Sequence, residues 1–349
     1  MSEADPIAGQ PAPTREVFIP YAIAFRRRVG TAVGAWTVRR GAWLRIEAGD
    51  GLVGLGEAAP LEPLASAQAL RAAIARGPYR DAAFDLARSD LEAQRAGKPL
   101  AAIFGEAPRA QVAVNALVFA PDAEGAAHEA AAAAALGYRT VKLKVASAPP
   151  EVDIRRIVAV RERVGPDVAI RIDANGAWDE ASALRVLSAV AHCGIEYVED
   201  PVAGDARRVR ARCGIAVAAD VRTADEGWEV VRAKRADVLV LKPMAIGGLR
   251  VAHALARAAI DAGLGVVVTS SFDTAVGVAG ALHLAASLPG PARAHGLATV
   301  DLLEDAPLDG LAPAHAGLMR VPDGPGLGVR LREPAPPDSR EFWSAGNTD

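Results

Sequence analysis

The spacing of apolar residues changes along the chain, and its first third predicts strands followed by helices. Between Val17 and about Glu57 apolar and polar residues alternate, and the run Gly49-Asp50-Gly51 supplies a tight turn, so this segment predicts an antiparallel meander. From residue 66 to about 105 apolar residues recur every three or four positions, which indicates helices. Residues 16–110 are therefore expected to form an α+β domain.

After residue 110 the pattern becomes a regular alternation of short apolar strands and alanine-rich amphipathic segments. The predicted strands cover residues 112–117, 140–145, 169–173, 195–199, 215–220, 238–241, 265–269 and 295–298. Seven or eight consecutive βα units without a break in composition predict an α/β fold with a closed parallel barrel over residues 111–300. An open, doubly wound sheet is the alternative. The two ends, residues 1–15 and 336–349, are rich in Pro, Ala and small polar residues and are expected to be disordered.

Composition excludes several classes of partner. The chain has 349 residues, of which 51% are hydrophobic, and 39 basic residues are balanced by 42 acidic ones. No basic face for nucleic acid or anionic lipid is expected from this mixture. The apolar stretch 264–288 contains Asp273 and His283, so it predicts a strand and a buried helix and no membrane span. The pattern gives no indication of the oligomeric state.

Cysteine usage and the N-terminus suggest a reducing compartment. Cys193 and Cys213 are the only cysteines, which is too few for a disulfide framework or a thiolate zinc site. The first residues lack a basic segment followed by an apolar run, so a secretory signal is not expected. We therefore expect a cytoplasmic protein.

Charged side chains stand where apolar strands should end. The predicted strands end in, or are followed by, six such residues: Lys142, Lys144, Asp173, Glu199, Asp220 and Lys242. In a βα barrel these strand ends form the mouth in which active sites lie. Two residues apart on one strand, Lys142 and Lys144 project to the same side, which in a barrel is the interior.

Three acids on consecutive strands predict a metal site. Neighbouring parallel strands lie about 4.8 Å apart, so Asp173, Glu199 and Asp220 can converge on one ion. Three oxygen ligands with room for water or substrate suit Mg²⁺, with Mn²⁺ as a substitute, whereas zinc would prefer His or Cys. The alternative is that each acid caps the helix that follows it.

Two lysines flank this predicted ion. Lys144 on the second strand and Lys242 after the sixth would lie on opposite sides of the barrel, with a small carboxylate substrate between them. The charges of Lys142 and of the ion both favour the neutral amine of Lys144, which can then act as a base. The alternative is that the lysines only balance the acids as salt bridges.

Several motifs resemble the muconate-lactonizing subgroup of the enolase superfamily. They are residues 140–145 (TVKLKV), 172–178 (IDANGAW), 197–201 (YVEDP) and 240–243 (VLKP) with Gly247-Gly248, while 83–87 (AFDLA) and 96–100 (AGKPL) resemble its capping-domain helices. The resemblance covers about residues 17–330. It implies a modified (β/α)7β barrel, an α+β capping domain formed mainly by the N-terminal segment, and a segment 301–335 that returns to this domain.

Within that subgroup, residues 270–277 (SSFDTAVG) and 296–299 (GLAT) resemble the o-succinylbenzoate synthase family most. This implies an Mg²⁺-dependent dehydration of a cyclohexadiene carboxylate to 2-succinylbenzoate in menaquinone biosynthesis. By this resemblance Lys144 would remove the α-proton and Lys242 would stabilise the enediolate from the opposite face. Asp173, Glu199 and Asp220 would bind Mg²⁺, and four further residues are expected near the substrate: Lys142, Asn175, Ser270 and Ser271.

One departure from the subgroup concerns the third acid. Asp220 is followed by Val221-Arg222, where the subgroup usually has Glu-Ser. A carboxylate beside the ligand is therefore missing, which implies weaker metal binding or altered activity because such neighbours tune ligands.

Other functions remain open from the sequence. An N-succinylamino acid racemase or dipeptide epimerase also needs two opposed lysines, and a binding protein without catalysis is a further alternative. Residues 49–54 match GxGxxG, the pattern of an NAD-dependent oxidoreductase, but they lie between two predicted strands and indicate a hairpin. The basic run Arg26-Arg27-Arg28 is interpreted either as a loop that closes over an anionic substrate or as a solvated cluster.

Overall fold

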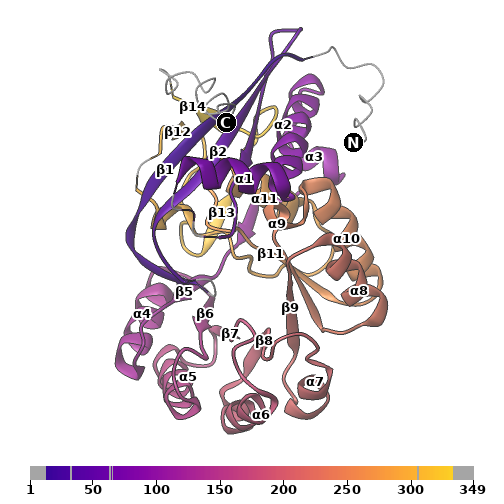
Figure 1. Ribbon diagram of the computed structural model, residues 1–349. Helices are drawn as coiled ribbons and strands as arrows, with labels where there is room; N and C mark the ends of the chain where they lie inside the picture. Colours follow the sequence, from indigo (N-terminus) through magenta and orange to yellow (C-terminus); the bar gives the residue numbers. More distant parts are fainter. Residues whose placement is uncertain (1–12, 32–33, 63, 65, 305, 333–349) are drawn as a thin grey trace.

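The computed structural model describes residues 13–31, 34–62, 64, 66–304 and 306–332, which form a βα barrel and a smaller α+β unit (Figure 1). The smaller unit, called the capping domain below, starts with an antiparallel sheet of order β1-β2-β3. Its elements are β1 (Pro13–Thr31), β2 (Gly34–Ala48), β3 (Val53–Ala58), α1 (Ala67–Arg76), α2 (Tyr79–Arg95) and α3 (Ala101–Phe104). The meander and helices predicted for this part are confirmed.

Local residues explain two boundaries of the capping domain. The β2–β3 turn is closed by a hydrogen bond from the Gly51 N–H to the Ala48 carbonyl, and Gly51 has a φ of 83°, which glycine adopts without strain. Residues 49–54 are thus a hairpin, so the alternative of a dinucleotide-binding turn is wrong. β1 begins at Pro13, within the stretch that was expected to be disordered; residues 1–12 and the predicted tail 336–349 lie outside the described residues.

The barrel consists of seven hydrogen-bonded parallel strands with helices on their outer side. The strand order is β11-β10-β9-β8-β7-β6-β5, which follows the sequence without a reversal, so the doubly wound alternative is wrong. Its elements are β4 (Gln111–Ala113), β5 (Ala116–Val118), α4 (Ala123–Ala135), β6 (Thr140–Lys144), α5 (Pro150–Val164), β7 (Ala169–Asp173), α6 (Glu180–Ala189), the 3₁₀ turn η1 (Ala191–Cys193), β8 (Ile195–Glu199), α7 (Arg207–Cys213), β9 (Val217–Val221), α8 (Ala224–Ala233), β10 (Val238–Leu241), α9 (Pro243–Ile246), α10 (Leu249–Asp261), β11 (Gly265–Val268) and α11 (Ala275–Ser287).

Residues 295–296 close the barrel. His295 exchanges backbone hydrogen bonds with Ala113 and Asn115 on one side, and Gly296 bonds to Val268 and Ser270 on the other. These bonds join the chain at residues 113–115, just before β5, to the end of β11, so the segment takes the place of an eighth strand. The predicted strand 295–298 is reduced to these bridges, and the predicted strand 112–117 is divided into β4 and β5.

The segment after residue 300 contacts the capping domain. It contains η2 (Val300–Leu302), β12 (Leu308–Asp309), β13 (Leu318–Arg320) and β14 (Arg330–Leu331). Glu304 donates a backbone hydrogen bond to Ala24 of β1, and Leu327 donates one to the buried carboxylate of Asp90 in α2. β13 pairs with β4, so the same segment also extends the barrel edge.

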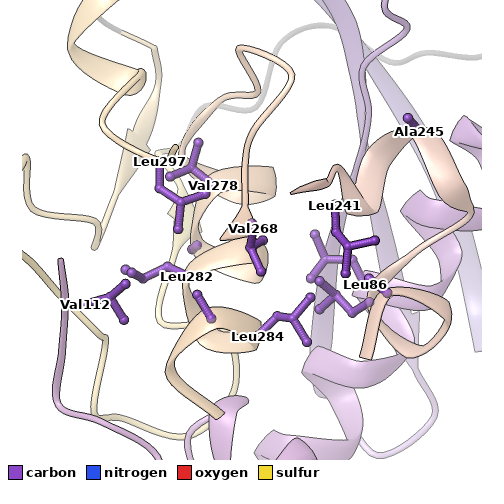
Figure 2. Close-up of a cluster of buried hydrophobic side chains, with 14 of the residues drawn as sticks. Leu86, Val112, Leu241, Ala245, Val268, Val278, Leu282, Leu284 and Leu297 are labelled. Carbon is purple, nitrogen blue, oxygen red and sulfur yellow. The ribbon is translucent and has the colours of Figure 1, made fainter. Parts of the chain in front are cut away.

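One apolar cluster joins the two parts of the molecule. Helix α11 is buried over almost its whole length, as its uniformly apolar sequence predicts. Figure 2 shows Leu282 of α11, Val268 of β11 and Leu86 of the capping domain within this cluster. In the part of the chain described, no helix is both long and apolar enough to cross a lipid bilayer.

Candidate active site

The three predicted acids lie on adjacent strands at one end of the barrel. Asp173 ends β7 and Glu199 ends β8, and the two residues are in register with each other and with Lys144 at the end of β6. On β9, Asp220 lies two residues beyond Ala218, the partner of Glu199. All three side chains are buried, with exposed fractions of 1%, 1% and 8%. The structure therefore brings the predicted acids to the barrel mouth.

None of these acids caps the following helix. The residues that precede α6, α7 and α8 are Asp179, Ala206 and Thr223, and the side chains of Asp179 and Thr223 accept the capping hydrogen bonds. The capping alternative for the three acids is wrong. Their carboxylates therefore take their partners at the barrel mouth and not at a helix N-terminus.

Each acid instead contacts a lysine. The Lys142 ammonium donates to both oxygens of Glu199 at 2.7 Å and lies 2.9 Å from Asp173 Oδ2. The Lys144 ammonium lies 2.5 Å from the same Asp173 oxygen, and Lys242 is paired with Asp220. Because the Lys142 ammonium contacts both Asp173 and Glu199, these two carboxylates lie close together.

The salt bridges expected as an alternative role for the lysines are thus present. In the described ranges no three acid, histidine or cysteine side chains already surround one point as ligands of an ion would. Each of the three acids is paired with an ammonium group there. Lys144 and Lys242 stand on β6 and after β10, separated by the three strands that carry the acids, as predicted.

Burial and crowding shift the protonation of this cluster. Burial alone would raise the pKa of Asp173, but Lys142 and Lys144 outweigh it and hold that pKa well below its usual range. The pKa of Glu199 is raised, first by burial and then by repulsion from Asp173. Although burial would lower the pKa of Lys142, its two acidic partners raise it well above the ordinary value. Lys142 therefore stays charged.

Asp200 is a fourth acid that the sequence reasoning overlooked. It is the residue after Glu199, has a φ of 42°, and accepts a hydrogen bond of 3.1 Å from the Asp220 N–H. Burial, followed by repulsion from Asp220 and Glu199, raises its pKa to about 8. Four crowded acids thus face three ammonium groups. The YVEDP motif, which places a second acid beside Glu199, was the signal that could have indicated it.

The donor set fits a divalent cation. Asp220 Oδ1 is buried without a hydrogen-bond partner in the described part of the chain, and an unsatisfied buried carboxylate oxygen is costly. The pKa of Glu199 and of Asp200 is raised first by burial and then by repulsion from neighbouring acids, so negative charge is crowded at this point. Oxygen ligands with excess negative charge suit Mg²⁺ or Mn²⁺.

The first residue of the departure after Asp220 lies on the other face of β9. Val221 is fully buried in the apolar cluster shared with α8 and α10, because alternate residues of a strand face opposite sides. Arg222 donates its backbone N–H to Glu226 at the start of α8. Val221 therefore directs no side chain toward the acids, and the side chain of Arg222, which follows the end of β9, is exposed.

The remaining predicted residues lie near the same mouth. Asn175 accepts a hydrogen bond from Lys144 at 3.3 Å and donates to Asp173. Ser270 is buried and bonded to Thr299 at 2.7 Å, whereas the buried hydroxyl of Ser271 has no partner among the described residues. Lys142 forms ion pairs with Asp173 and Glu199.

The basic run at residues 26–28 includes a contact with the barrel. Arg27 donates to Glu129 of α4 at 3.1 Å, and its guanidinium lies 4.9 Å from the centroid of the Phe119 ring. The side chain of Arg28 lies outside the described residues. Arg27 therefore pairs with the barrel while its side chain stays 45% exposed, so both interpretations of the run remain predictions.

Comparisons with known proteins place this geometry in a family. Residues 125–335 match the family described as enolase C-terminal domain-like. The chain is 42% identical over 217 residues to o-succinylbenzoate synthase of Thermobifida fusca, covering 60% of this chain and 67% of the relative. It is 30% identical over 271 residues to an N-succinyl-L-Arg/Lys racemase of Bacillus cereus, covering 73% and 70%.

Solved structures share the whole fold. The dipeptide epimerase of Enterococcus faecalis V583, crystallised with Mg and L-Leu-L-Tyr, superposes with a TM-score of 0.82 at 28% identity over 91% of this chain and 99% of that one. The predicted barrel with its capping domain and the resemblance to the enolase superfamily are confirmed.

Proposed function

This chain belongs to the enolase C-terminal domain-like family, and we propose that it acts there as an o-succinylbenzoate synthase. The reaction would remove water from a cyclohexadiene carboxylate and give aromatic 2-succinylbenzoate, a step of menaquinone biosynthesis. The observation that carries the proposal is the arc of three buried strand-end acids between Lys144 and Lys242. Such a site could bind several small carboxylates, and the similarity to the Thermobifida fusca synthase favours the cyclohexadiene carboxylate.

Asp173, Glu199 and Asp220 would hold Mg²⁺, or Mn²⁺ in its place. A bound ion would supply positive charge to the substrate carboxylate, which lowers the barrier to removal of the neighbouring proton. The Asp220 oxygen without a hydrogen-bond partner among the described residues and the repulsion between the crowded acids support this assignment. Asp200 would steady Asp220 through the hydrogen bond to its backbone.

Lys144 would be the base. When Asp173 serves as a ligand, Lys144 is released from its ion pair with that carboxylate, and its nitrogen can turn toward the substrate. Its nitrogen would take the α-proton and then return that proton to the departing hydroxide, which leaves as water. On the opposite side of the site, Lys242 would stabilise the negative charge that develops on the substrate. Asn175 would orient Lys144, and Ser270 and Ser271 would contact the substrate.

Racemisation of an N-succinylamino acid is the second candidate. Two lysines on opposite sides of the acids can remove a proton from one face and return it to the other, and the Bacillus cereus racemase is a relative over most of this chain. Both reactions use a small carboxylate substrate and the same base. For either, we place the enzyme in the cytoplasm, where the free thiols of Cys193 and Cys213 stay reduced.

An ultraviolet assay of aromatisation tests the proposal. Wild type should produce 2-succinylbenzoate with Mg²⁺ and lose the activity after chelation. Lys144→Ala should lower kcat by roughly 10²–10⁴-fold, the usual contribution of a general base. Lys98→Ala, which removes an exposed lysine of the capping domain, is the matched control and should behave as wild type.

Two results would overturn the assignment. Aromatisation at the wild-type rate by Lys144→Ala would remove Lys144 from its role. Solvent deuterium entering an N-succinylamino acid faster than wild type dehydrates the cyclohexadiene would establish the racemase as the main function.

A further inference from the structure

Glu57 is a fully buried acid of the capping domain that reaches into the barrel. It lies on β3 and has an exposed fraction of 0%. Its Oε1 accepts hydrogen bonds from the Tyr21 hydroxyl and from the Thr274 N–H at 2.9 Å. Its Oε2 accepts from the Thr274 hydroxyl at 2.8 Å and from the Gly277 N–H at 2.7 Å. Three of the four donors belong to the barrel.

These barrel donors form the beginning of α11. Thr274 precedes the helix, yet its own side chain makes no capping hydrogen bond. Gly277 is the third residue of the helix, whose N–H is normally satisfied by the side chain of the preceding cap. Glu57 therefore performs the capping role from another domain, and its negative charge suits the positive end of the helix dipole.

The Glu57 carboxylate is closely packed against Gly277. A Cβ added to Gly277 would lie 3.0 Å from Glu57 Oε2 and 2.7 Å from the Cβ of Asp273. Any larger residue at position 277 would push the carboxylate or the preceding loop aside. Glycine at this position is thus required for the close approach.

The capping domain holds the rest of the β11–α11 loop, residues 269–274, through two further side chains. Buried Arg39 donates to the Phe272 carbonyl at 3.0 Å and is itself fixed by the carbonyls of Ala59 and Pro60. Phe272 has a φ of 58°, a left-handed conformation that is unfavourable for a residue other than glycine. Trp43 donates to the Thr274 hydroxyl at 2.9 Å. The loop conformation is therefore imposed by the capping domain.

This loop follows the C-terminal end of β11, one of the strand ends that form the barrel mouth, and carries two polar atoms that have no hydrogen-bond partner among the described residues. Ser271 Oγ and Asp273 Oδ1 are buried and make no hydrogen bond within the described part of the chain. Burial and then the charge of Glu57 raise the pKa of Asp273, while Arg39, whose Nη2 lies 3.9 Å from Asp273 Oδ1, opposes the rise. Unsatisfied buried polar atoms are costly, and a polar group of a ligand would relieve that cost.

We propose that Glu57 is a positioning residue for the substrate: it fixes the β11–α11 loop so that Ser271 and Asp273 meet the part of the substrate that lies away from the metal. The inference rests on the proposed function, because it takes the barrel mouth as the substrate site. It adds that a capping-domain carboxylate outside that mouth controls substrate binding.

Glu57→Gln is the central variant. A glutamine places an NH₂ group against the N–H of Thr274 or Gly277, so one donor loses its acceptor and the loop is released. Gly277→Ala disturbs the same contact while Glu57 remains. Glu92→Gln is the matched control, because Glu92 also joins the capping domain to the barrel, through Arg250 of α10, but lies away from the loop.

Three measurements are made on each folded protein: kcat and KM for aromatisation, Mg²⁺ affinity by calorimetry, and amide hydrogen exchange of residues 270–277. Glu57→Gln and Gly277→Ala should raise KM at least tenfold, leave kcat within about threefold, leave Mg²⁺ affinity unchanged, and speed exchange in the loop. Glu92→Gln should match wild type in all four quantities. A loss confined to substrate binding is the signature of contacts made equally in ground and transition states.

A wild-type KM and wild-type loop exchange in Glu57→Gln would overturn the inference. A lower melting temperature with unchanged KM would do the same, since it would show a structural role only. If wild type itself does not aromatise the substrate, the proposed function fails, and loop exchange with and without Glu57 still decides whether the loop is held as we infer.

Discussion

Replacing Lys142 by methionine tests whether the acids at the barrel mouth need positive charge. The Lys142 side chain is 11% exposed and its ammonium contacts Asp173 and Glu199, whose side chains are 0% and 1% exposed. Methionine keeps an unbranched apolar chain of similar length but removes the charge. Two buried carboxylates are then left facing each other without the cation between them.

The size of the effect follows from this burial. Removing one member of a buried ion pair typically costs about 3–5 kcal/mol, because the remaining charge is left without a partner. For a chain of 349 residues, such a loss corresponds to a fall in melting temperature of roughly 4–7 °C. Lys144 contacts the same Asp173 oxygen but is 28% exposed, so Lys144→Met should cost less, about 1 kcal/mol after allowance for solvent screening.

Thermal unfolding with chelator and with millimolar Mg²⁺ provides the assay. In chelator, Lys142→Met should melt well below Lys144→Met and wild type. Mg²⁺ should raise the melting temperature of Lys142→Met more than that of wild type, because an ion then supplies the missing charge and stabilises the state that binds it. Equal melting temperatures of the two variants in chelator, or no greater response of Lys142→Met to Mg²⁺, would refute the account of the site as a cluster short of positive charge.

Two further predictions concern helix α11. Burial lowers the pKa of His283 to about 4 from its ordinary 6.5, so the stability it contributes is complete above about pH 6.5 and is lost as the pH falls toward 4. The free energy of unfolding, measured by urea titration, should fall between about pH 7.5 and 4.5 by about 2–3 kcal/mol less in His283→Gln than in wild type. In His128→Gln, at an exposed position, this free energy should fall as much as in wild type. An equal fall with pH in all three proteins would contradict the prediction. Leu282→Ala, which empties a fully buried position of the cluster in Figure 2, should lower the free energy of unfolding by about 2–5 kcal/mol without changing KM, while Leu136→Ala at a position 68% exposed should change neither.

The positions of the acids and lysines could be predicted because they depend on backbone repeats alone. A strand places alternate residues on one face, and parallel strands in sequence order place their ends together. Those two rules put Lys144, Asp173 and Glu199 side by side, and the register of β6, β7 and β8 confirms it. The spacing of one βα unit between successive acids also predicted that they lie on consecutive strands.

The partners of these side chains could not be predicted from the same rules. The sequence indicated that Lys142 shares a face with Lys144, but which acid each ammonium meets depends on side-chain length and on how deeply each group is buried. Asp200 received no role from the strand pattern because it follows the predicted strand 195–199; a φ of 42° turns the chain there, and its carboxylate accepts from the Asp220 N–H. Local backbone exceptions of this kind leave no mark in a hydrophobic pattern.

The contact between Glu57 and α11 shows a second limit, which is set by distance along the chain. Glu57 is 217 residues from Thr274, and nothing in the spacing of either segment refers to the other. Each segment is nevertheless incomplete alone: β3 carries an acid on a buried strand, and α11 begins with Thr274 making no side-chain cap. A buried acid and an uncapped helix each carry a cost that the other removes. Searching a sequence for such complementary deficits, in place of local patterns, is how a contact between domains could be anticipated before the fold is known.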